Sequence, residues 1–359
     1  MTVAQAEKNL VLLYTGAINK GESLKNLPTP FFWGPPGVGK SASVYQMASQ
    51  IEELTSKKVY VTDVRLLLYS PVDLRGVPVA DSAREFANWL KPKIFDLRAD
   101  EDCVNILFLD ELSAAPQSVQ AAAYQICLDR KIGEFELPEN TVVIAAGNRT
   151  CDASISYKMP KALANRLLHF DITSDYASWR SWALKNNISD KVIAYLGFAP
   201  ERLCVEPESS ELAYPTPRSW AFVSSLLNMT GKEPYEIPEL IAGCVGEDSA
   251  IEFVTFCKGS LRLPDIEEIF DGVCRQKPAT YDCMYALISK LTCEMLNRAD
   301  ELDEAKIDNA CRYVTGFPKD FATTFMLDIN TSETLNRKLM QSRSFQLWLG
   351  KNKDLFKRG

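Results

Sequence analysis

The eight residues from Gly34 to Ser41 carry the clearest chemical pattern in this chain, because they read GPPGVGKS. They fit the pattern G-x-x-x-x-G-K-[ST] and stand between an apolar run at 31–33 and a helical pattern that starts near residue 44. Glycines let such a loop fold around an anion, with N–H groups and a helix N-terminus directed at phosphates. Lys40 would reach the β and γ phosphates, and Ser41 would ligate Mg²⁺. The predicted cofactor-binding residues are Gly34, Pro35, Pro36, Gly37, Val38, Gly39, Lys40 and Ser41.

Two adjacent carboxylates, Asp110 and Glu111, end an apolar segment that starts at Asn105. A strand of this type brings its carboxyl end to the ligand crevice of an open α/β sheet. Asp110 would hold Mg²⁺ through a water molecule, and Glu111 would orient or deprotonate the attacking water. An alternative is that the two residues cap the following helix, since acidic side chains are common at helix N-termini. The phosphate-loop pattern upstream favours the catalytic interpretation.

A second apolar segment, 142–147, ends on Asn148, whose amide is predicted to hold the attacking water or to sense the γ phosphate. In one alternative Asn148 forms an ordinary turn, and in another it is a glycosylation acceptor, because residues 148–150 fit that pattern. The ten cysteines contain no CxxC pair and the chain has one histidine, so no zinc site is indicated. We expect a reducing, cytoplasmic compartment, where the glycosylation alternative does not apply.

The composition is that of a folded protein, with 359 residues of which 46% are hydrophobic and 24% charged. This length allows two or three domains. The net charge of -7 lacks the basicity expected of a protein that binds phosphate backbones, which disfavours nucleic acid as a partner. The apolar run at 10–18 is too short to cross a bilayer, so we expect no membrane partner.

Strand-like runs alternate with helical patterns in the first half of the chain, which predicts helices packed on a mostly parallel sheet. The five runs rich in β-branched or aromatic residues are 31–33, 59–64, 104–109, 141–145 and 169–172. Apolar residues at helical spacing in 44–54 and 119–126 predict two helices that cover this sheet. After residue 175 strand patterns largely stop, and the remainder is predicted to be helical.

Six sequence blocks, in order, resemble the MoxR-type AAA+ ATPases over about residues 5–230. The blocks are GPPGVGKS, DVRLLLYSPVDLRGVP, NILFLDE, DRKIGEFELPENTVVIAAGNR, MPKALANRLLHF and YPTPRSW. The resemblance implies an α/β fold with three parts. These are an AAA+ αβα P-loop core at 1–175 with a five-stranded parallel sheet and a central phosphate-loop strand, an α-helical lid at 176–255, and a helical C-terminal region at 256–359. It also implies ATP and Mg²⁺ as cofactors, and a homo-oligomeric ring, usually a hexamer, with ATP at the subunit interfaces.

Two arginines acquire roles from the same resemblance. Arg166 matches the arginine finger, which reaches the γ phosphate in a neighbouring subunit. Alternatively, Arg166 is a surface cation at a helix end that interacts favourably with the helix dipole. Arg218 matches the second sensor, which the lid contributes to nucleotide on its own subunit. A helix start agrees with this position, because Thr216 can cap a helix and Pro217 suits its first residue.

Two further blocks match special features of these proteins. Residues 73–78 match an insertion within the second helix, and residues 131–138 match a hairpin before the first sensor strand. The resemblance implies that either segment lines the ring pore or moves with nucleotide state. Their composition alone describes ordinary loops.

The leading functional hypothesis is an ATP hydrolase whose ring couples hydrolysis to remodelling, assembly or activation of a partner protein, as a chaperone does. The resemblance implies a partner with a von Willebrand factor A domain, on a separate chain because no DxSxS-type metal motif occurs here. A nucleotide-controlled assembly scaffold is an alternative that uses the same residues. A nucleic-acid motor is a third hypothesis, and the acidic balance and lack of a basic, aromatic-rich run argue against it.

Overall fold

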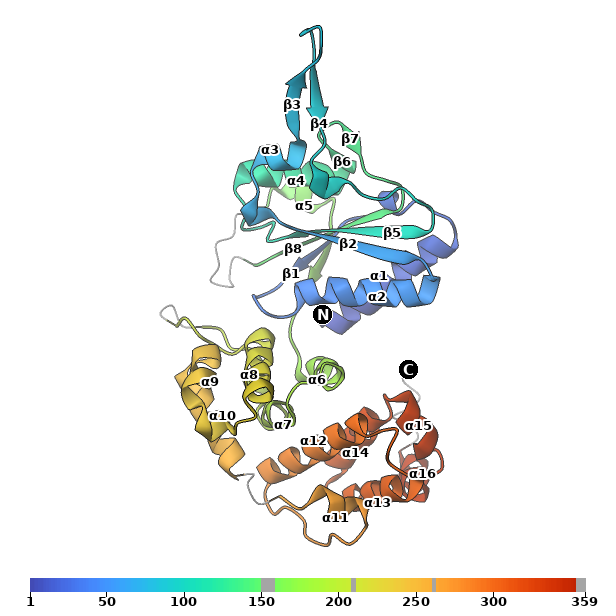
Figure 1. Cartoon of the computed structure of the whole chain (residues 1–359), viewed down its shortest axis with the longest axis vertical. Helices are drawn as coiled ribbons and strands as arrows, with labels where there is room; N and C mark the ends of the chain where they lie inside the picture. The colour runs from blue at the N-terminus through green and yellow to red at the C-terminus, as the bar shows by residue number, and fades with distance from the viewer. Residues whose placement is uncertain (150–158, 208–210, 260–262, 353–359) are drawn as a thin grey trace. The chain divides into compact units, whose positions relative to one another are not determined.

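The computed structural model describes residues 1–149, 159–207, 211–259 and 263–352, and excludes the side chains of residues 162 and 163 (Figure 1). The chain divides into two compact units, Met1–Ser174 and Asp175–Gly359. Among the described residues, no helix is both long enough and apolar enough to cross a membrane. Each cysteine in these ranges has a free thiol.

The first unit contains a five-stranded parallel sheet, which confirms the predicted fold class. Its strands are β1 (Pro30–Trp33), β2 (Lys58–Arg65), β5 (Cys103–Asp110), β8 (Thr141–Gly147) and β9 (Leu168–Asp171), in the order β2-β5-β8-β1-β9. The phosphate-loop strand β1 lies inside the sheet, between β8 and β9, and the middle strand of the five is β8. The reason is the path of the chain. After β1 it enters the sheet at the β2 edge and adds β5 and β8 on the way back, whereas β9 joins the other side of β1.

Helices cover both faces of this sheet. All residues of β5 and of β8 are buried, as expected for parallel strands that are covered on both sides. The helices α1 (Val3–Asn19) and α2 (Lys40–Thr55) pack together on one face, and α4 (Gln117–Asp129) lies on the opposite face (Figure 1). The short helices of this unit are η1 (Leu24–Asn26), η2 (Leu66–Leu68), α3 (Pro71–Arg75), η3 (Lys93–Phe95) and α5 (Lys161–Ala164).

Two small hairpins form where composition alone describes ordinary loops. The strands β3 (Val77–Ala80) and β4 (Ala87–Leu90) pair antiparallel and project from the core (Figure 1). The strands β6 (Lys131–Ile132) and β7 (Phe135–Glu136) form the second hairpin, immediately after α4. The segment 131–138 contains the second hairpin, whereas 73–78 spans the end of α3 and the first residues of β3. What the two segments contact stays a prediction.

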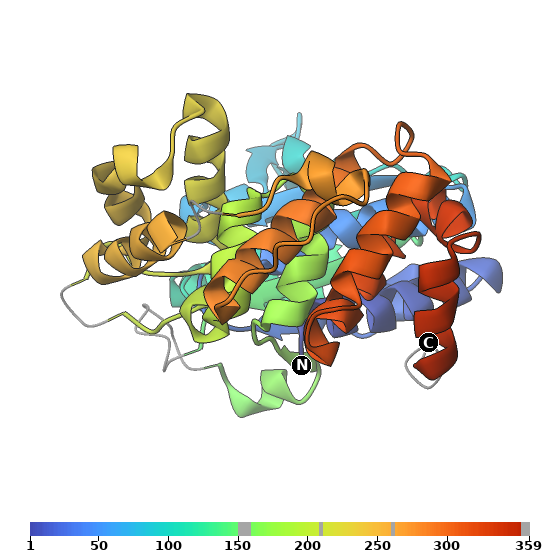
Figure 2. The same ribbon diagram turned by 90° about the horizontal axis from the view of Figure 1, so that it is seen from below.

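The second unit is helical, as predicted. Its first helices are α6 (Tyr176–Lys185), α7 (Asp190–Phe198), η4 (Pro200–Leu203), α8 (Pro217–Thr230), η5 (Pro234–Glu236), α9 (Pro238–Val245) and α10 (Glu247–Gly259). The following helices are α11 (Ile266–Phe270), α12 (Tyr281–Asn297), α13 (Glu304–Val314), α14 (Lys319–Ile329), α15 (Glu333–Leu339) and α16 (Arg343–Lys351). Figure 2 shows the helices from α12 onward, in orange and red, side by side.

Two apolar clusters stabilise the helices of the second unit. In the first, the ring of Tyr195 lies 5.3 Å from that of Trp220 and 5.4 Å from that of Phe253, measured between centroids. The second cluster contains the buried side chains of α11 to α16. Helix α12 joins them, because it packs against both α7 and α14. The ion pair between Arg180 on α6 and Asp328 on α14, 2.8 Å long and buried, is a further link.

One buried carboxyl group on α1 predicts a pH dependence of stability. Glu7 is 8% exposed, and burial raises its pKa from 4.5 to about 7. The folded state therefore keeps this proton at pH values where the unfolded chain has lost it. For this reason the free energy of unfolding falls as the pH rises from 4.5 to about 7. We expect Glu7→Gln to raise the free energy of unfolding at about pH 8 by about 1–3 kcal/mol and to flatten its decline.

Urea unfolding at several pH values between about 5 and 8 measures this effect. The matched control is Glu53→Gln, which changes an exposed carboxyl group on α2. The free energy of unfolding of the control should decline with pH as steeply as that of the parent protein. If the free energy of unfolding of Glu7→Gln declines with pH as steeply as that of the parent, another group causes the decline.

Candidate nucleotide-binding site

The phosphate loop connects β1 directly to the N-terminus of α2. Gly39 is the N-cap of α2 and has a φ of 99°, a left-handed conformation that side-chain-bearing residues rarely adopt. A glycine is therefore required at the point where the loop becomes helix. The first turn of α2 follows the loop without a break, which is the arrangement that binds phosphates at a helix N-terminus.

Lys40 and Asn148, which were predicted from separate motifs, are in contact. The Nζ atom of Lys40 donates to the Oδ1 atom of Asn148 at 2.9 Å. It also donates to the carbonyl oxygens of Gly34 at 2.6 Å and Pro35 at 2.9 Å. These three acceptors are neutral, and they orient the ammonium group. Lys40 is 8% exposed, and its charge is therefore held inside the loop.

Ser41 and Asp110 form the second contact between separate motifs. The Ser41 hydroxyl donates to Oδ2 of Asp110 at 2.7 Å, and Oδ1 of Asp110 accepts from the Glu111 N–H at 2.9 Å. A hydroxyl from α2 and a carboxylate from β5 thus lie side by side. Mg²⁺ prefers hard oxygen ligands of this kind, so the residues present fit this ion.

Glu111 lies in a tight turn after β5 and is not the cap of the following helix. Its φ of 59° is left-handed, and its carbonyl oxygen accepts from the N–H groups of Ala114 and Ala115. Helix α4 begins at Gln117 with Pro116 as its N-cap. A residue other than glycine in this conformation costs about 1 kcal/mol, and such strain gathers at functional sites.

Ser113 ties this turn to the end of β8. Its hydroxyl donates to the carbonyl oxygen of Asn148 at 2.9 Å, and the N–H of Leu112 donates to the carbonyl oxygen of Ala146 at 2.9 Å. A Cβ atom on Gly147 would lie 2.5 Å from the Ser113 hydroxyl, so only glycine fits there. The turn that carries Glu111 and the strand that carries Asn148 are therefore held in one register.

The structure adds two residues that the motif analysis missed. Asp63 lies on β2, which pairs with β5, and the Tyr45 hydroxyl donates to its Oδ2 atom at 3.5 Å. Burial and the nearby Asp110 carboxylate raise the pKa of Asp63. The available signal was positional: Tyr45 follows Ser41 by one helical turn, and Asp63 stands near the carboxyl end of a predicted strand.

The two predicted arginines are both exposed. Arg166 lies just beyond α5 in the first unit. Arg218 lies in the first turn of α8, where Thr216 accepts from the Ser219 N–H at 3.0 Å and Pro217 is the first helical residue. The predicted helix start at 216–217 is therefore confirmed. Arg218 belongs to the second unit, and its action at the phosphates stays a prediction.

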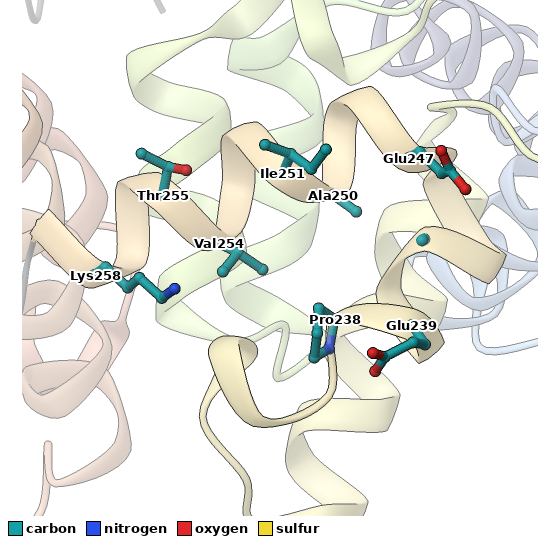
Figure 3. A pocket seen from close by; sticks show the side chains of 9 residues that line it. Pro238, Glu239, Glu247, Ala250, Ile251, Val254, Thr255 and Lys258 are labelled. Atoms are coloured by element: carbon teal, nitrogen blue, oxygen red, sulfur yellow. The ribbon is translucent and has the colours of Figure 1, made fainter.

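A groove of about 340 Å³ lies between α9 and α10 of the second unit (Figure 3). Its apolar lining consists of Pro238, Ala242, Ala250, Ile251 and Val254. The charged residues around it are Glu239, Glu247 and Lys258. Two carboxylates beside one cation do not suit a triphosphate, so the nucleotide candidate is the phosphate-loop site.

Comparison with protein families gives a match over the sheet. The family model described as "ATPase family associated with various cellular activities (AAA)" matches residues 30–172. This range starts with β1 and ends just after β9, and it contains the phosphate loop, both carboxylates, Asn148 and Arg166. The first unit therefore holds an AAA ATPase domain.

A relative narrows this assignment. "Chaperone MoxR1" of Mycobacterium tuberculosis (strain ATCC 25618 / H37Rv) is 26% identical over 170 residues. The aligned part covers 46% of this chain and 39% of the relative, so the match spans less than half of the relative's length. The AAA domain and this similarity confirm the resemblance to the MoxR-type AAA+ ATPases that the six sequence blocks indicated.

Several solved structures are similar to this chain at low scores. The Aeropyrum pernix Orc1 protein in complex with DNA has a TM-score of 0.39 at 13% identity, covering 94% of this chain and 84% of that one. A mutant of Thermotoga maritima RuvB has a TM-score of 0.37 at 16% identity, covering 86% and 88%. The C. elegans protein PCH-2 has a TM-score of 0.35 at 17% identity, covering 72% and 69%. The fold assignment rests on the sheet order and the family match instead.

Proposed function

We propose that this protein binds ATP with Mg²⁺ at the phosphate loop and hydrolyses it. The observation that carries the proposal is the meeting of separate motifs, with Lys40 on Asn148 and Ser41 on Asp110. The loop and Lys40 bind the phosphates, and Ser41 and Asp110 hold the ion. Bound Mg²⁺ would neutralise charge on the phosphate oxygens.

The remaining two polar residues, Glu111 and Asn148, act on the attacking water. Glu111 follows Asp110 directly and orients this water or accepts its proton. Asn148 lies beside Lys40 and positions the water or senses the γ phosphate. The strained turn and its tie through Ser113 support this role, because they fix the carboxylate relative to the amide.

The proposed working form is a ring of copies, usually six in such proteins. Arg166 reaches the γ phosphate on the neighbouring subunit, where a cation offsets the charge that develops in phosphoryl transfer. Arg218 at the start of α8 reaches nucleotide on its own subunit, from a lid at 176–255. The exposure of both arginines supports roles outside the packed core.

The proposed purpose of hydrolysis is remodelling, assembly or activation of a protein, in the cytoplasm and with a separate von Willebrand factor A domain partner. Similarity to a protein named as a chaperone supports this class. The net charge of -7 argues against a nucleic-acid motor. A scaffold that uses ATP to fix its assembly is the alternative, and a turnover rate that rises on adding the partner would favour the remodelling function.

Lys40→Ala tests nucleotide binding at this site. The variant should bind ATP at least about tenfold more weakly, because a hydrogen-bonded charge of this kind contributes about 1.5–3 kcal/mol. Direct binding of a fluorescent ATP analogue measures the loss. Lys8→Ala, which removes an exposed cation on α1, is the matched control and should bind normally. Equal affinity in the two variants would remove the phosphate-loop assignment.

A further inference from the structure

His169, the single histidine of the chain, links two segments of the proposed site. It lies on β9 and contacts a neighbour through each ring nitrogen. The Trp33 indole Nε1–H donates to Nδ1 of His169 at 2.8 Å. The Nε2 atom of His169 lies 2.7 Å from the carbonyl oxygen of Ala164. One imidazole thus bridges the end of β1 to the end of α5.

The chemistry of the partners determines which nitrogen carries the proton. The indole N–H of Trp33 is a donor only, so Nδ1 of His169 must accept. The Ala164 carbonyl oxygen is an acceptor only, so Nε2 must donate. The neutral imidazole meets both demands in one tautomer. The rings of Trp33 and His169 also stack, with an interplanar angle of 21° and a centroid distance of 6.1 Å, which fixes their orientation.

Both ends of this bridge are next to residues of the proposed machinery. Trp33 is the last residue of β1 and directly precedes Gly34, whose carbonyl oxygen accepts from Lys40. Ala164 is the last residue of α5 and precedes Arg166 by two positions. The bridge therefore connects the loop that holds one nucleotide to the arginine that serves the next site.

We propose that His169 is a positioning residue that sets the place of Arg166 according to the state of the phosphate loop in the same subunit. The inference rests on the proposed function, since it needs Arg166 to act on a neighbouring site. A shift of the loop on nucleotide binding moves Trp33, and the two hydrogen bonds of His169 carry this movement to α5. Occupancy of one site thereby adjusts the finger offered to the next.

His169→Phe tests the link, because it keeps a ring for stacking and removes both hydrogen bonds. The variant keeps Lys40, Asp110 and Glu111, so we expect its ATP affinity to stay within about twofold of the parent. Its turnover should fall roughly ten- to a hundredfold, the scale for displacing a catalytic group by about 1 Å. Trp33→Phe removes the donor at the other end and should lower turnover in the same direction.

Mixing subunits separates an effect on the neighbour from an effect on the subunit itself. A Glu111→Gln subunit is inactive but offers a normal finger, so a mixture with His169→Phe should recover part of the activity, as a mixture with Arg166→Ala should. Recovery with Arg166→Ala but not with His169→Phe would overturn this inference alone. Recovery in neither mixture would overturn the action of Arg166 on its neighbour, and the link with it.

A third readout does not depend on turnover. Trp33 reports on its own surroundings, so ATP binding should change a fluorescence signal that disappears in Trp33→Phe.

His169→Gln keeps a donor for the Ala164 carbonyl and should retain more turnover than His169→Phe. Equal turnover in His169→Phe and the parent protein would contradict the proposal, and so would a loss of ATP affinity that explains the whole effect.

Discussion

Arg166→Ala is expected to lower the ATPase rate by about a thousandfold, the lower end of the effect of an arginine finger. The residue is exposed beyond α5, so its removal should leave the free energy of unfolding within about 0.5 kcal/mol of the parent. ATP affinity should also persist, because Lys40 and Ser41 remain. Phosphate release at saturating ATP measures the rate, and direct binding measures the affinity.

A mixture of Arg166→Ala with Glu111→Gln gives the decisive control for this prediction. Each protein alone lacks one catalytic part, but an interface between them can hold a complete site. Activity should return in part when the subunits exchange. Lack of recovery in assemblies that demonstrably contain both variants would show that Arg166 does not act across an interface. The helix-dipole alternative, worth under about 1 kcal/mol, predicts a near-normal rate for Arg166→Ala.

Glu111→Gln is expected to slow hydrolysis by at least about a hundredfold, since a positioned base contributes on this scale. ATP binding should be unchanged, because the substitution leaves the loop and the Ser41 to Asp110 contact in place. The variant should therefore retain ATP without turning it over. Single-turnover measurement of phosphate formation, with ATP bound at known stoichiometry, separates this outcome from weak binding.

The comparison variant for Glu111 is Glu53→Gln, an exposed carboxyl group on the same unit. Its rate should equal that of the parent protein. The alternative in which the acidic pair caps a helix predicts lost stability instead, yet the N-cap of α4 is Pro116. Normal turnover by Glu111→Gln would assign the base to another residue, and Asp63, whose pKa burial and the Asp110 carboxylate raise, would then be the next carboxyl group to examine.

The strands of the sheet could be predicted from the sequence because of how they are buried. β5 and β8 are covered on both faces and read as unbroken apolar runs, which is a strong local pattern. The hairpin of β3 and β4 is mostly exposed, so it leaves no such pattern and reads as a loop. Strand order is set by the connections between strands and has no local pattern in the sequence, so it followed from the family resemblance alone.

The same distinction applies to the candidate site. Lys40, Ser41, Asp110 and Glu111 stand in short motifs whose spacing has a chemical reason. Contacts between distant segments have no local pattern. Ser113 and the carbonyl oxygen of Asn148 are far apart in the sequence, and His169 is an ordinary residue of a strand until Trp33 is found beside it.

The buried ion pair between Arg180 and Asp328 couples the movement of α6 to that of α14. Its charges lie in surroundings from which water is largely excluded, and separating them would leave each without a counter-charge, at a cost of about 3–5 kcal/mol. Thermal motion rarely supplies this much energy, so α6 and α14 should stay in contact and move together. The first helix of the second unit is thus tied by charge to the C-terminal helical cluster that contains α14.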